Sequence, residues 1–286
     1  MTDALPIVRT ADALRAKIRQ WRVAGNRIAL VPTMGALHDG HLSLVRHGRS
    51  LADRVVVSIF VNPTQFGPSE DFTAYPRQES RDATLLTLAG ASLLYAPTVA
   101  DMYPSGFATA IQVGGPSEGL CGTIRPGHFS GVATVVCKLL TRAMPDVALF
   151  GEKDYQQLQV IKRLARDLDL PVEIVGGATV READGLAMSS RNAYLSAAER
   201  AMAPSLYRVL SAMAGRLTAG DTIEALEAWG KQEILAAGFP SIDYLETRDT
   251  DGLRPLQGVL KVPARILVAA RLGKTRLIDN IAAAPA

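Results

Sequence analysis

Two of the four histidines in this 286-residue chain, His38 and His41, stand three positions apart in the stretch PTMGALHDGH at residues 32–41. Side chains with this spacing at the start of a helix point to the same side. A helix N-terminus offers free N–H groups and the positive end of a dipole, which suits phosphate. Imidazole N–H groups beside it could hold phosphate oxygens as negative charge builds up, and Gly35 and Gly40 allow a tight turn and close approach. The pattern indicates a phosphate-binding loop; two surface histidines in a turn are the alternative.

A second polar cluster, GEKDYQQ at residues 151–157, combines a glycine with a cation and an amide. Gly151 permits close approach of a ligand, and Lys153 can place a compact positive charge near phosphates. Gln157 lies one turn further on and could face the same pocket. Asp154 could join them, but it is also a good helix N-cap, and capping could be its whole role.

A third cluster, GLAMSSRN at residues 185–192, places two hydroxyls before an arginine. Ser189 and Ser190 are donors, and the planar guanidinium of Arg191 can hold a phosphate through two parallel hydrogen bonds. A polar turn ahead of the next helix is the alternative. Together the three clusters indicate chemistry at the phosphates of a nucleotide, although the chain has no Walker A, GxGxxG, kinase or Gly-x-Ser-x-Gly motif.

Short apolar segments alternate with helical patterns over the first two thirds of the chain, and the polar clusters follow such segments. We predict strands at residues 28–31, 54–61, 91–95, 146–150 and 172–175, and helices at 13–21 behind a Thr10 N-cap, 41–52, 77–89, 131–143 and 154–168. This alternation is typical of βαβ units around a parallel sheet. The predicted fold is therefore α/β, a Rossmann-like parallel sheet with helices on both faces and ligands at the carboxyl ends of its strands.

The pattern changes near residue 180. A helical run opens at Ser196 and extends to residue 217, and Asp221 is expected to cap another helix that ends near residue 236. Residues 241–247, 265–270 and 275–279 alternate like antiparallel strands. We therefore predict a Rossmann-like ligand-binding domain at 1–179 and a smaller C-terminal α+β domain at 180–286 that closes over the active site.

Composition and charge exclude several classes of protein. Hydrophobic residues make up 48% and charged residues 21%, as in a globular protein, and the net charge of +3 comes without a run of five like charges. A nucleic-acid partner is therefore not expected. Cys121 and Cys137 fall in no CxxC or His/Cys cluster, which disfavours a disulfide framework or a zinc site, and we expect both to be small buried apolar residues. The absence of a signal-peptide pattern or membrane-length apolar stretch favours the cytoplasm by default.

The HxGH stretch and the distant Met-Ser-Ser-Arg loop resemble the nucleotidyltransferase superfamily, which includes class I aminoacyl-tRNA synthetases. Within it, the chain resembles the pantothenate synthetase family. The matching stretches are PTMGALHDGH at 32–41, VNPTQFG at 61–67, YPR at 75–77, RPGHFSGV at 125–132, FGEKD at 150–154 with Gln157, RE at 181–182 with DGLAMSSRN at 184–192, and TRLIDN at 275–280. They run in order over almost the whole chain.

The resemblance implies a reaction in which pantoate is activated by ATP to pantoyl adenylate and then condensed with β-alanine, giving pantothenate, AMP and pyrophosphate. It implies that the domain at 1–179 binds ATP and pantoate, with Mg²⁺ accompanying ATP, no prosthetic group, no membrane partner and a homodimer. ATP would contact Met34, Gly35, Ala36, Leu37, His38, Asp39, Gly40, His41, Gly151, Glu152, Lys153, Asp154, Val180, Met188, Ser189, Ser190 and Arg191. Gln65 and Gln157 would hold pantoate, and Gln65 would also touch β-alanine. The catalytic residues would be His38, His41, Lys153, Ser189, Ser190 and Arg191, with His41 as proton donor. No protein side chain is expected as a metal ligand.

Several points stay open at this level. His41 could act by stabilising charge on the phosphates, because a helix N-terminus disfavours imidazolium. Asn62 and His128 could be pocket residues or turn residues, Tyr75 is expected to pack, and Asp82 is expected to be an exposed helix acid rather than a Mg²⁺ ligand. The alternative functions are adenylylation of a phosphate-bearing substrate, a tRNA synthetase, and an inactive nucleotide-binding module.

Overall fold

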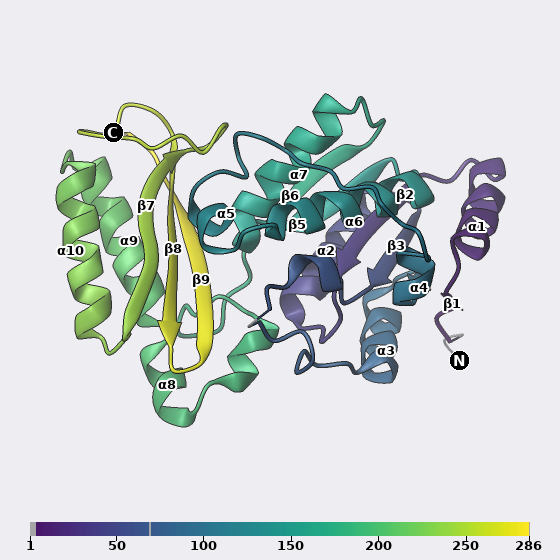
Figure 1. The fold of residues 1–286 in the computed structure, drawn as a ribbon, viewed down its shortest axis with the longest axis horizontal. Coiled ribbons are helices and arrows are strands. Elements are labelled where there is room, and N and C mark those ends of the chain that lie inside the picture. The colour runs from purple at the N-terminus through teal and green to yellow at the C-terminus, as the bar shows by residue number, and fades with distance from the viewer. Residues whose placement is uncertain (1–3, 69, 286) are drawn as a thin grey trace.

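The computed structural model describes residues 4–68 and 70–285. Its larger part is a six-stranded sheet in which every pair of neighbours is parallel, in the order β1-β4-β3-β2-β5-β6 (Figure 1). The strands are β1 (Ile7–Val8), β2 (Ile28–Thr33), β3 (Arg54–Ile59), β4 (Leu93–Tyr95), β5 (Val147–Gly151) and β6 (Glu173–Gly177). The chain builds outward from β2 through β3 to β4, and later places β5 on the other side of β2. The direction therefore reverses between β2 and β5, where open sheets of this kind bind ligands.

Helices cover both faces of this sheet, as predicted. They are α1 (Ala11–Val23), α2 (Asp39–Leu51), α3 (Glu79–Ala89), α4 (Val99–Met102), α5 (Leu120–Ile124), α6 (His128–Ala143) and α7 (Tyr155–Asp167). Successive side chains of β2 enter different cores because side chains alternate across a strand. Ile28 and Leu30 pack with α1, α6 and α7, whereas Ala29 and Val31 pack with α2 and α3. All four are fully buried.

The predicted elements of this part are confirmed in type, and their ends shift by a few residues. Thr10 does cap α1, because its Oγ1 accepts a hydrogen bond of 3.2 Å from the backbone N–H of Ala13. The sequence did not predict β1, α4 and α5. Each is at most five residues long, too short to show a hydrophobic period.

The C-terminal part is a three-stranded antiparallel sheet backed by helices (Figure 1). It comprises α8 (Ala197–Met202), α9 (Ser205–Thr218), α10 (Ile223–Ala236), β7 (Ser241–Asp249), β8 (Ala264–Leu272) and β9 (Thr275–Ala283). Helices α9 and α10 pack on the sheet around a core of their own. The α/β fold with a smaller α+β part is therefore confirmed, whereas the domain limits 1–179 and 180–286 stay a prediction.

Two predictions about the helices of this part were wrong. The run from Ser196 to residue 217 is two helices, because Pro204 has no N–H to continue the hydrogen-bond ladder of α8 and instead stands at the start of α9. The N-cap position of α10 is Thr222 rather than Asp221. Asp221 instead accepts a 2.7 Å hydrogen bond from Nε of Arg216 in the preceding helix.

None of the helices in the described ranges combines the length and the apolar character that crossing a membrane requires.

Candidate active site

A cavity of about 220 Å³ opens at the carboxyl ends of β2 and β5, where the order of the parallel sheet reverses. Most of the predicted site residues line it. They are Met34, His38, Gly40, His41, Gln65, Gly151, Lys153, Asp154, Gln157, Val180, Met188, Ser189, Ser190 and Arg191. The structure thus brings together three loops, of which the first and the last lie more than 100 residues apart in the sequence.

Five residues predicted to bind ATP are not among those that line the cavity. They are Gly35, Ala36, Leu37, Asp39 and Glu152. Leu37 is buried in the core on the α2 side of the sheet, and Asp39 is exposed. Their contact with ATP stays a prediction.

The two histidines cap helix α2 and bring their rings together. His38 is the N-cap residue, and its Nδ1 accepts a 3.2 Å hydrogen bond from the N–H of Gly40. Nδ1 of His41 faces the N–H of His38 at 3.4 Å. Because a neutral imidazole has one donor and one acceptor nitrogen, both protons are assigned to Nε2. The ring centroids are 4.1 Å apart, so the site holds two N–H donors side by side.

Burial keeps both rings neutral. It lowers the pKa of His41 to about 3, with the neighbouring His38 adding to the effect, and it lowers the pKa of His38 to about 4, with Lys153 adding to it. Gly40 must be glycine for this arrangement, because a Cβ there would lie 2.9 Å from the His38 ring. At neutral pH the loop therefore offers hydrogen bonds from uncharged imidazoles.

Asp82 of α3 fixes the loop that leads to these histidines. Its side chain accepts hydrogen bonds of 2.9 Å from the backbone N–H groups of both Ala36 and Leu37. The expectation of an exposed helix acid was wrong, since Asp82 is only 1% exposed. Helical position alone does not reveal a partner 45 residues away. Gly35 lies at φ +83° beside this carboxylate, where a side chain would be strained.

The turn between β5 and α7 carries the cationic part of the site. Lys153 and Gln157 line the cavity, whereas Glu152 pairs with Arg265 of β8 at 2.8 Å. Asp154 occupies the N-cap position of α7 but makes no capping hydrogen bond with its side chain. Capping therefore does not account for Asp154, and its carboxylate lines the cavity beside Lys153.

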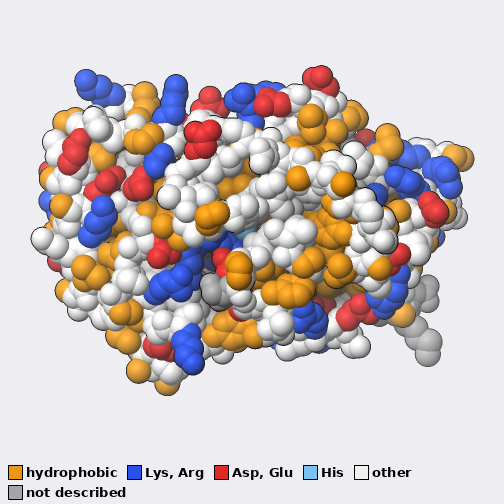
Figure 2. Space-filling view, viewed as in Figure 1, with side chains coloured by type: hydrophobic (Ala, Val, Ile, Leu, Met, Phe, Trp, Pro, Cys, Tyr) orange, Lys and Arg blue, Asp and Glu red, His pale blue; other side chains and the backbone are white. Residues whose placement is uncertain are grey.

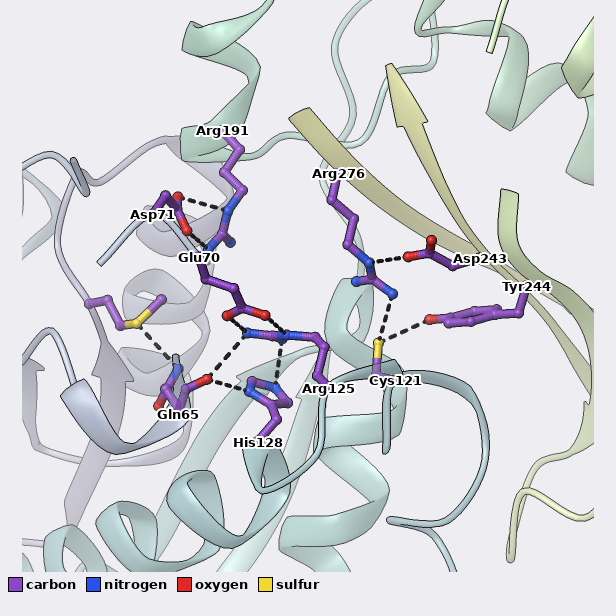
Figure 3. A network of polar contacts seen from close by, with 11 residues as sticks. Gln65, Glu70, Asp71, Cys121, Arg125, His128, Arg191, Asp243, Tyr244 and Arg276 are labelled. Atoms are coloured by element: carbon purple, nitrogen blue, oxygen red, sulfur yellow. Dashed lines mark hydrogen bonds and ion pairs between the residues drawn. The ribbon is translucent and has the colours of Figure 1, made fainter. Parts of the chain in front are cut away.

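The third loop is engaged by residues of the segment between β3 and α3. Oγ of Ser189 accepts a 3.2 Å hydrogen bond from the N–H of Arg191, and Oγ of Ser190 lies 3.2 Å from the Tyr75 hydroxyl. Arg191 donates from Nε and Nη2 to the two carboxylate oxygens of Asp71, at 3.1 and 2.8 Å (Figure 3). The guanidinium is therefore paired with a carboxylate through two parallel hydrogen bonds, the geometry in which arginine also binds phosphate.

Gln65 is held by its neighbours on two sides. Its Oε1 accepts a 3.0 Å hydrogen bond from Nδ2 of Asn62, and its Nε2 points to the sulfur of Met34 at 3.3 Å. A thioether is a weak acceptor, so this N–H₂ group remains a good donor for a ligand. Asn62 is 1% exposed and lines the cavity. It also caps a short helical turn, so it is both a turn residue and a pocket residue.

Arg125 and His128 form a polar cluster next to Gln65 (Figure 3). Arg125 donates to both carboxylate oxygens of Glu70 at 2.6 Å and to Nε2 of His128 at 2.9 Å. Because arginine only donates, His128 is protonated on Nδ1, which donates to the Gln65 carbonyl at 2.8 Å. Burial, with Arg125 adding to it, lowers the pKa of His128 to about 4.

The predicted set of site residues left out Arg125, His128, Asn62 and Tyr75, although all four line the cavity. Their only signal in the sequence was the resemblance, since each type is common in turns or in packing.

A larger cavity of about 570 Å³ adjoins the first and shares Arg125, Lys153 and Arg191 with it. The β8–β9 hairpin supplies its other cations, which are Arg271, Lys274 and Arg276. Figure 2 shows Lys and Arg side chains gathered at the hollow between the two parts of the chain, with histidine visible inside it. Arg276 donates to Oδ2 of Asp243 at 2.6 Å and also reaches the Sγ of Cys121 at 3.4 Å (Figure 3).

Comparison with known proteins agrees with this geometry. Residues 6–282 match the family model described as pantoate-beta-alanine ligase. The chain is 61% identical over 285 residues to the pantothenate synthetase of Paramagnetospirillum magneticum, covering 100% of both chains. It is 60% identical over 278 residues to that of Rhodospirillum rubrum, covering 97% of this chain and 99% of the other.

Solved structures give the same result. The pantothenate synthetase from Thermus thermophilus superposes with a TM-score of 0.91 at 48% identity, covering 97% of this chain and 99% of that one. A pantoate-beta-alanine ligase from Francisella tularensis, complexed with beta-gamma ATP and beta-alanine, superposes with a TM-score of 0.80 at 35% identity, covering 97% of each chain. The predicted family and ligase class are confirmed, and the chain belongs to the pantoate–β-alanine ligase family.

Proposed function

We propose that this chain condenses pantoate with β-alanine at the expense of ATP, through a pantoyl-adenylate intermediate. The observation that carries the proposal is the pair of neutral histidines at the start of α2, which share one cavity with Lys153 and with the amides of Gln65 and Gln157. This combination suits a nucleoside triphosphate next to a small hydroxy acid. The ligase class follows from the family, whereas the assignment of residues below is ours.

In the first step, a carboxylate oxygen of pantoate attacks the α-phosphorus of ATP. One P–O bond forms, the bond between the α-phosphorus and the bridging oxygen breaks, and pyrophosphate leaves with the bond's electron pair. Such a transfer depends on positioning and charge neutralisation more than on covalent help. Nε2–H of His38 and of His41 would hold phosphate oxygens, and Lys153 would neutralise the charge that develops.

The low pKa of His41 favours charge stabilisation over proton donation. A ring whose pKa is lowered to about 3 is unprotonated at neutral pH, so it has no imidazolium proton to give away. Its Nε2–H can still donate a hydrogen bond that strengthens as the phosphates gain charge. His38 fits the same role, since its pKa is lowered to about 4.

Gln65 and Gln157 would bind pantoate. A neutral amide donates and accepts, so two amides can contact a hydroxyl and a carboxylate together. In the second step, the amine of β-alanine, also near Gln65, attacks the activated carbonyl. A C–N bond forms, the C–O bond to the phosphate breaks, and AMP leaves while the nitrogen loses a proton to solvent. No protein nucleophile is needed.

Ser189, Ser190 and Arg191 would close over the phosphates from the side of the C-terminal part. Arg191 would exchange Asp71 for a phosphate, since both offer two oxygens to its fork. Exclusion of water by this loop, and by the smaller domain at 180–286, would protect an adenylate that hydrolyses readily.

Mg²⁺ would enter bound to ATP, because it prefers phosphate oxygens and keeps several waters. Within residues 4–68 and 70–285, no three His, Cys, Asp or Glu side chains are grouped to hold a metal. The residues fit a cation carried by the substrate, to which Asp154 could add one oxygen from the cavity wall. A homodimer and a cytoplasmic location also belong to this proposal, and both rest on the family.

The test is release of AMP by the purified chain with ATP, Mg²⁺, pantoate and β-alanine, leaving out each component in turn. We expect AMP and pantothenate in equal amounts only when both organic substrates are present, and exchange of labelled pyrophosphate into ATP with pantoate alone. Lys153→Ala should lower the exchange rate, whereas Lys162→Ala, an exposed lysine of α7, should not. AMP release that ignores pantoate and β-alanine would contradict the proposal.

A further inference from the structure

Two adjacent polar residues of β9, Asp279 and Asn280, have no role in the reaction as described. They belong to the matched stretch TRLIDN at residues 275–280. Both are buried, at 5% and 3% exposure. Figure 1 shows β9 as the strand of the small sheet that lies next to the parallel-sheet part. Consecutive side chains of a strand point to opposite faces, so the two residues reach toward different segments.

Asn280 holds the turn that carries Lys153. Its Nδ2 donates to the backbone carbonyls of Glu152 and Lys153, both at 2.9 Å. The orientation of this amide is determined by its surroundings, because a flipped group would set Oδ1 against two carbonyl oxygens. The two donors of one buried amide therefore fix the backbone from which the Lys153 side chain extends.

A second residue of the same sheet grips this turn. Arg265 of β8 donates to Oε2 of Glu152 at 2.8 Å, and its guanidinium lies 4.0 Å above the Tyr155 ring. Arg265 lies two residues from Leu267, which is paired with Asn280 across the ladder, so Arg265 and Asn280 share one face of the sheet. This face is docked on the residues 152–155.

Asp279 holds the other loop through Arg181. Its carboxylate accepts hydrogen bonds of 2.6 and 2.9 Å from the guanidinium of Arg181. The Arg181 side chain also donates to the carbonyl of Gly185 at 3.0 Å. Arg181 pairs with Ala187 in an antiparallel bridge, so this contact braces both arms of the short hairpin that precedes Ser189.

We infer that Asp279 and Asn280 are positioning residues that set the Lys153 turn and the Ser189–Arg191 loop against each other. Neighbouring positions on one strand fix the two loops, one from each face. The inference rests on the proposed function, because it assigns both loops to the phosphates of ATP. It gives the antiparallel sheet a part in adenylation beyond covering the cavity.

The test separates the two half-reactions in Asn280→Ala. Adenylation is followed as pantoate-dependent exchange of labelled pyrophosphate into ATP, and the second step as pantothenate formation from prepared pantoyl adenylate and β-alanine. A displacement of about 1 Å lowers a rate by about 100-fold, so we expect exchange to fall by about 10- to 100-fold. The second step needs no triphosphate contact and should stay within about threefold of the parent chain. The ratio of the two rates does not depend on the fraction of molecules that fold.

Controls and a second variant keep the outcome clear. Ala282→Ser changes an exposed residue of the same strand and should leave both half-reactions unchanged. Asp279→Asn keeps the shape of the side chain but removes its charge, and should also lower exchange more than the second step. If Asn280 acts through Lys153, then Asn280→Ala should lower exchange by less than about threefold in a Lys153→Ala background.

Equal loss of both half-reactions, or an unchanged exchange rate in Asn280→Ala, would overturn the inference, as would a full further loss in the Lys153→Ala background. Failure of the proposed function is distinct, because the parent chain itself would then show no pantoate-dependent exchange.

Discussion

Two of the three loops that line the cavity, residues 34–41 and residues 188–191, are held in different ways. Asp82 fixes the backbone of the first, and each of its two histidines accepts a backbone N–H, which leaves Nε2–H for a ligand. The second loop presents Arg191, whose guanidinium is bound to Asp71. The first loop is thus held by bonds within the chain, whereas in the proposed mechanism the second would exchange one anion for another. The proposed mechanism therefore separates fixed neutral donors from a cation with a replaceable partner.

The largest effect should come from His41→Gln. Loss of one fixed donor to a developing charge lowers a rate by about 10²- to 10³-fold, so pyrophosphate exchange should fall by that factor. Since the pKa of His41 is lowered to about 3, the shape of the pH profile should not change between about pH 5.5 and 9. His47→Gln, an exposed histidine of the same helix, is the control. If the pH profile of His41→Gln instead loses its ascending or descending part, a proton transfer would be assigned to this ring.

Asp82→Ala should damage the fixed loop without touching the cavity wall. Two backbone N–H groups would lose a charged acceptor, so the free energy of unfolding should fall by about 2–4 kcal/mol. The exchange rate should fall by about tenfold or more, because the histidines follow the loop backbone. Urea unfolding and exchange kinetics measure the two effects, with Asp12→Ala on the surface of α1 as control. An unchanged exchange rate in the folded variant would mean that Asp82 contributes only to the stability of the fold.

The buried neutral His41 of the first loop should make the folded state less stable in acid. Because the folded-state pKa of His41 is lowered from 6.5 to about 3, the unfolded chain binds a proton below pH 6.5 that the folded chain does not. The stability contribution is present above pH 6.5 and is lost as the pH falls toward 3. Between about pH 7 and 5, His41→Gln should therefore lose about 1–2 kcal/mol less unfolding free energy than the parent chain. Equal losses, measured by urea unfolding at both pH values, would contradict the buried neutral state.

The difference between the loops also explains what the sequence could reveal. Local spacing identified the histidine pair, the strand that precedes it and the helix that follows, because these signals lie within about 25 residues of one another. The same reasoning wrongly placed Asp82 on a solvent face, and it did not identify Asp71 as a partner of Arg191. The two contacts span 45 and 120 residues, which only the folded chain brings together. By contrast, Pro204 is a signal in the sequence for the break in the predicted helix at 196–217. We predicted one helical run there because we followed the hydrophobic pattern rather than the proline.

The smallest effect should come from Asp71→Asn, which tests directly whether the carboxylate partner of Arg191 is replaceable. The ion pair is partly exposed, with side-chain exposures of 31% for Arg191 and 24% for Asp71, so it contributes at most about 1 kcal/mol. If ATP must displace Asp71, its removal should tighten ATP binding by about two- to fivefold, measured by titration calorimetry. Asp221→Asn, which disrupts an exposed Arg–Asp pair outside the cavity, should change nothing. Unchanged or weaker ATP binding in Asp71→Asn would mean that Arg191 keeps its partner in the complex. The two loops would then both be fixed before the ligand arrives, and the contrast between them would not hold.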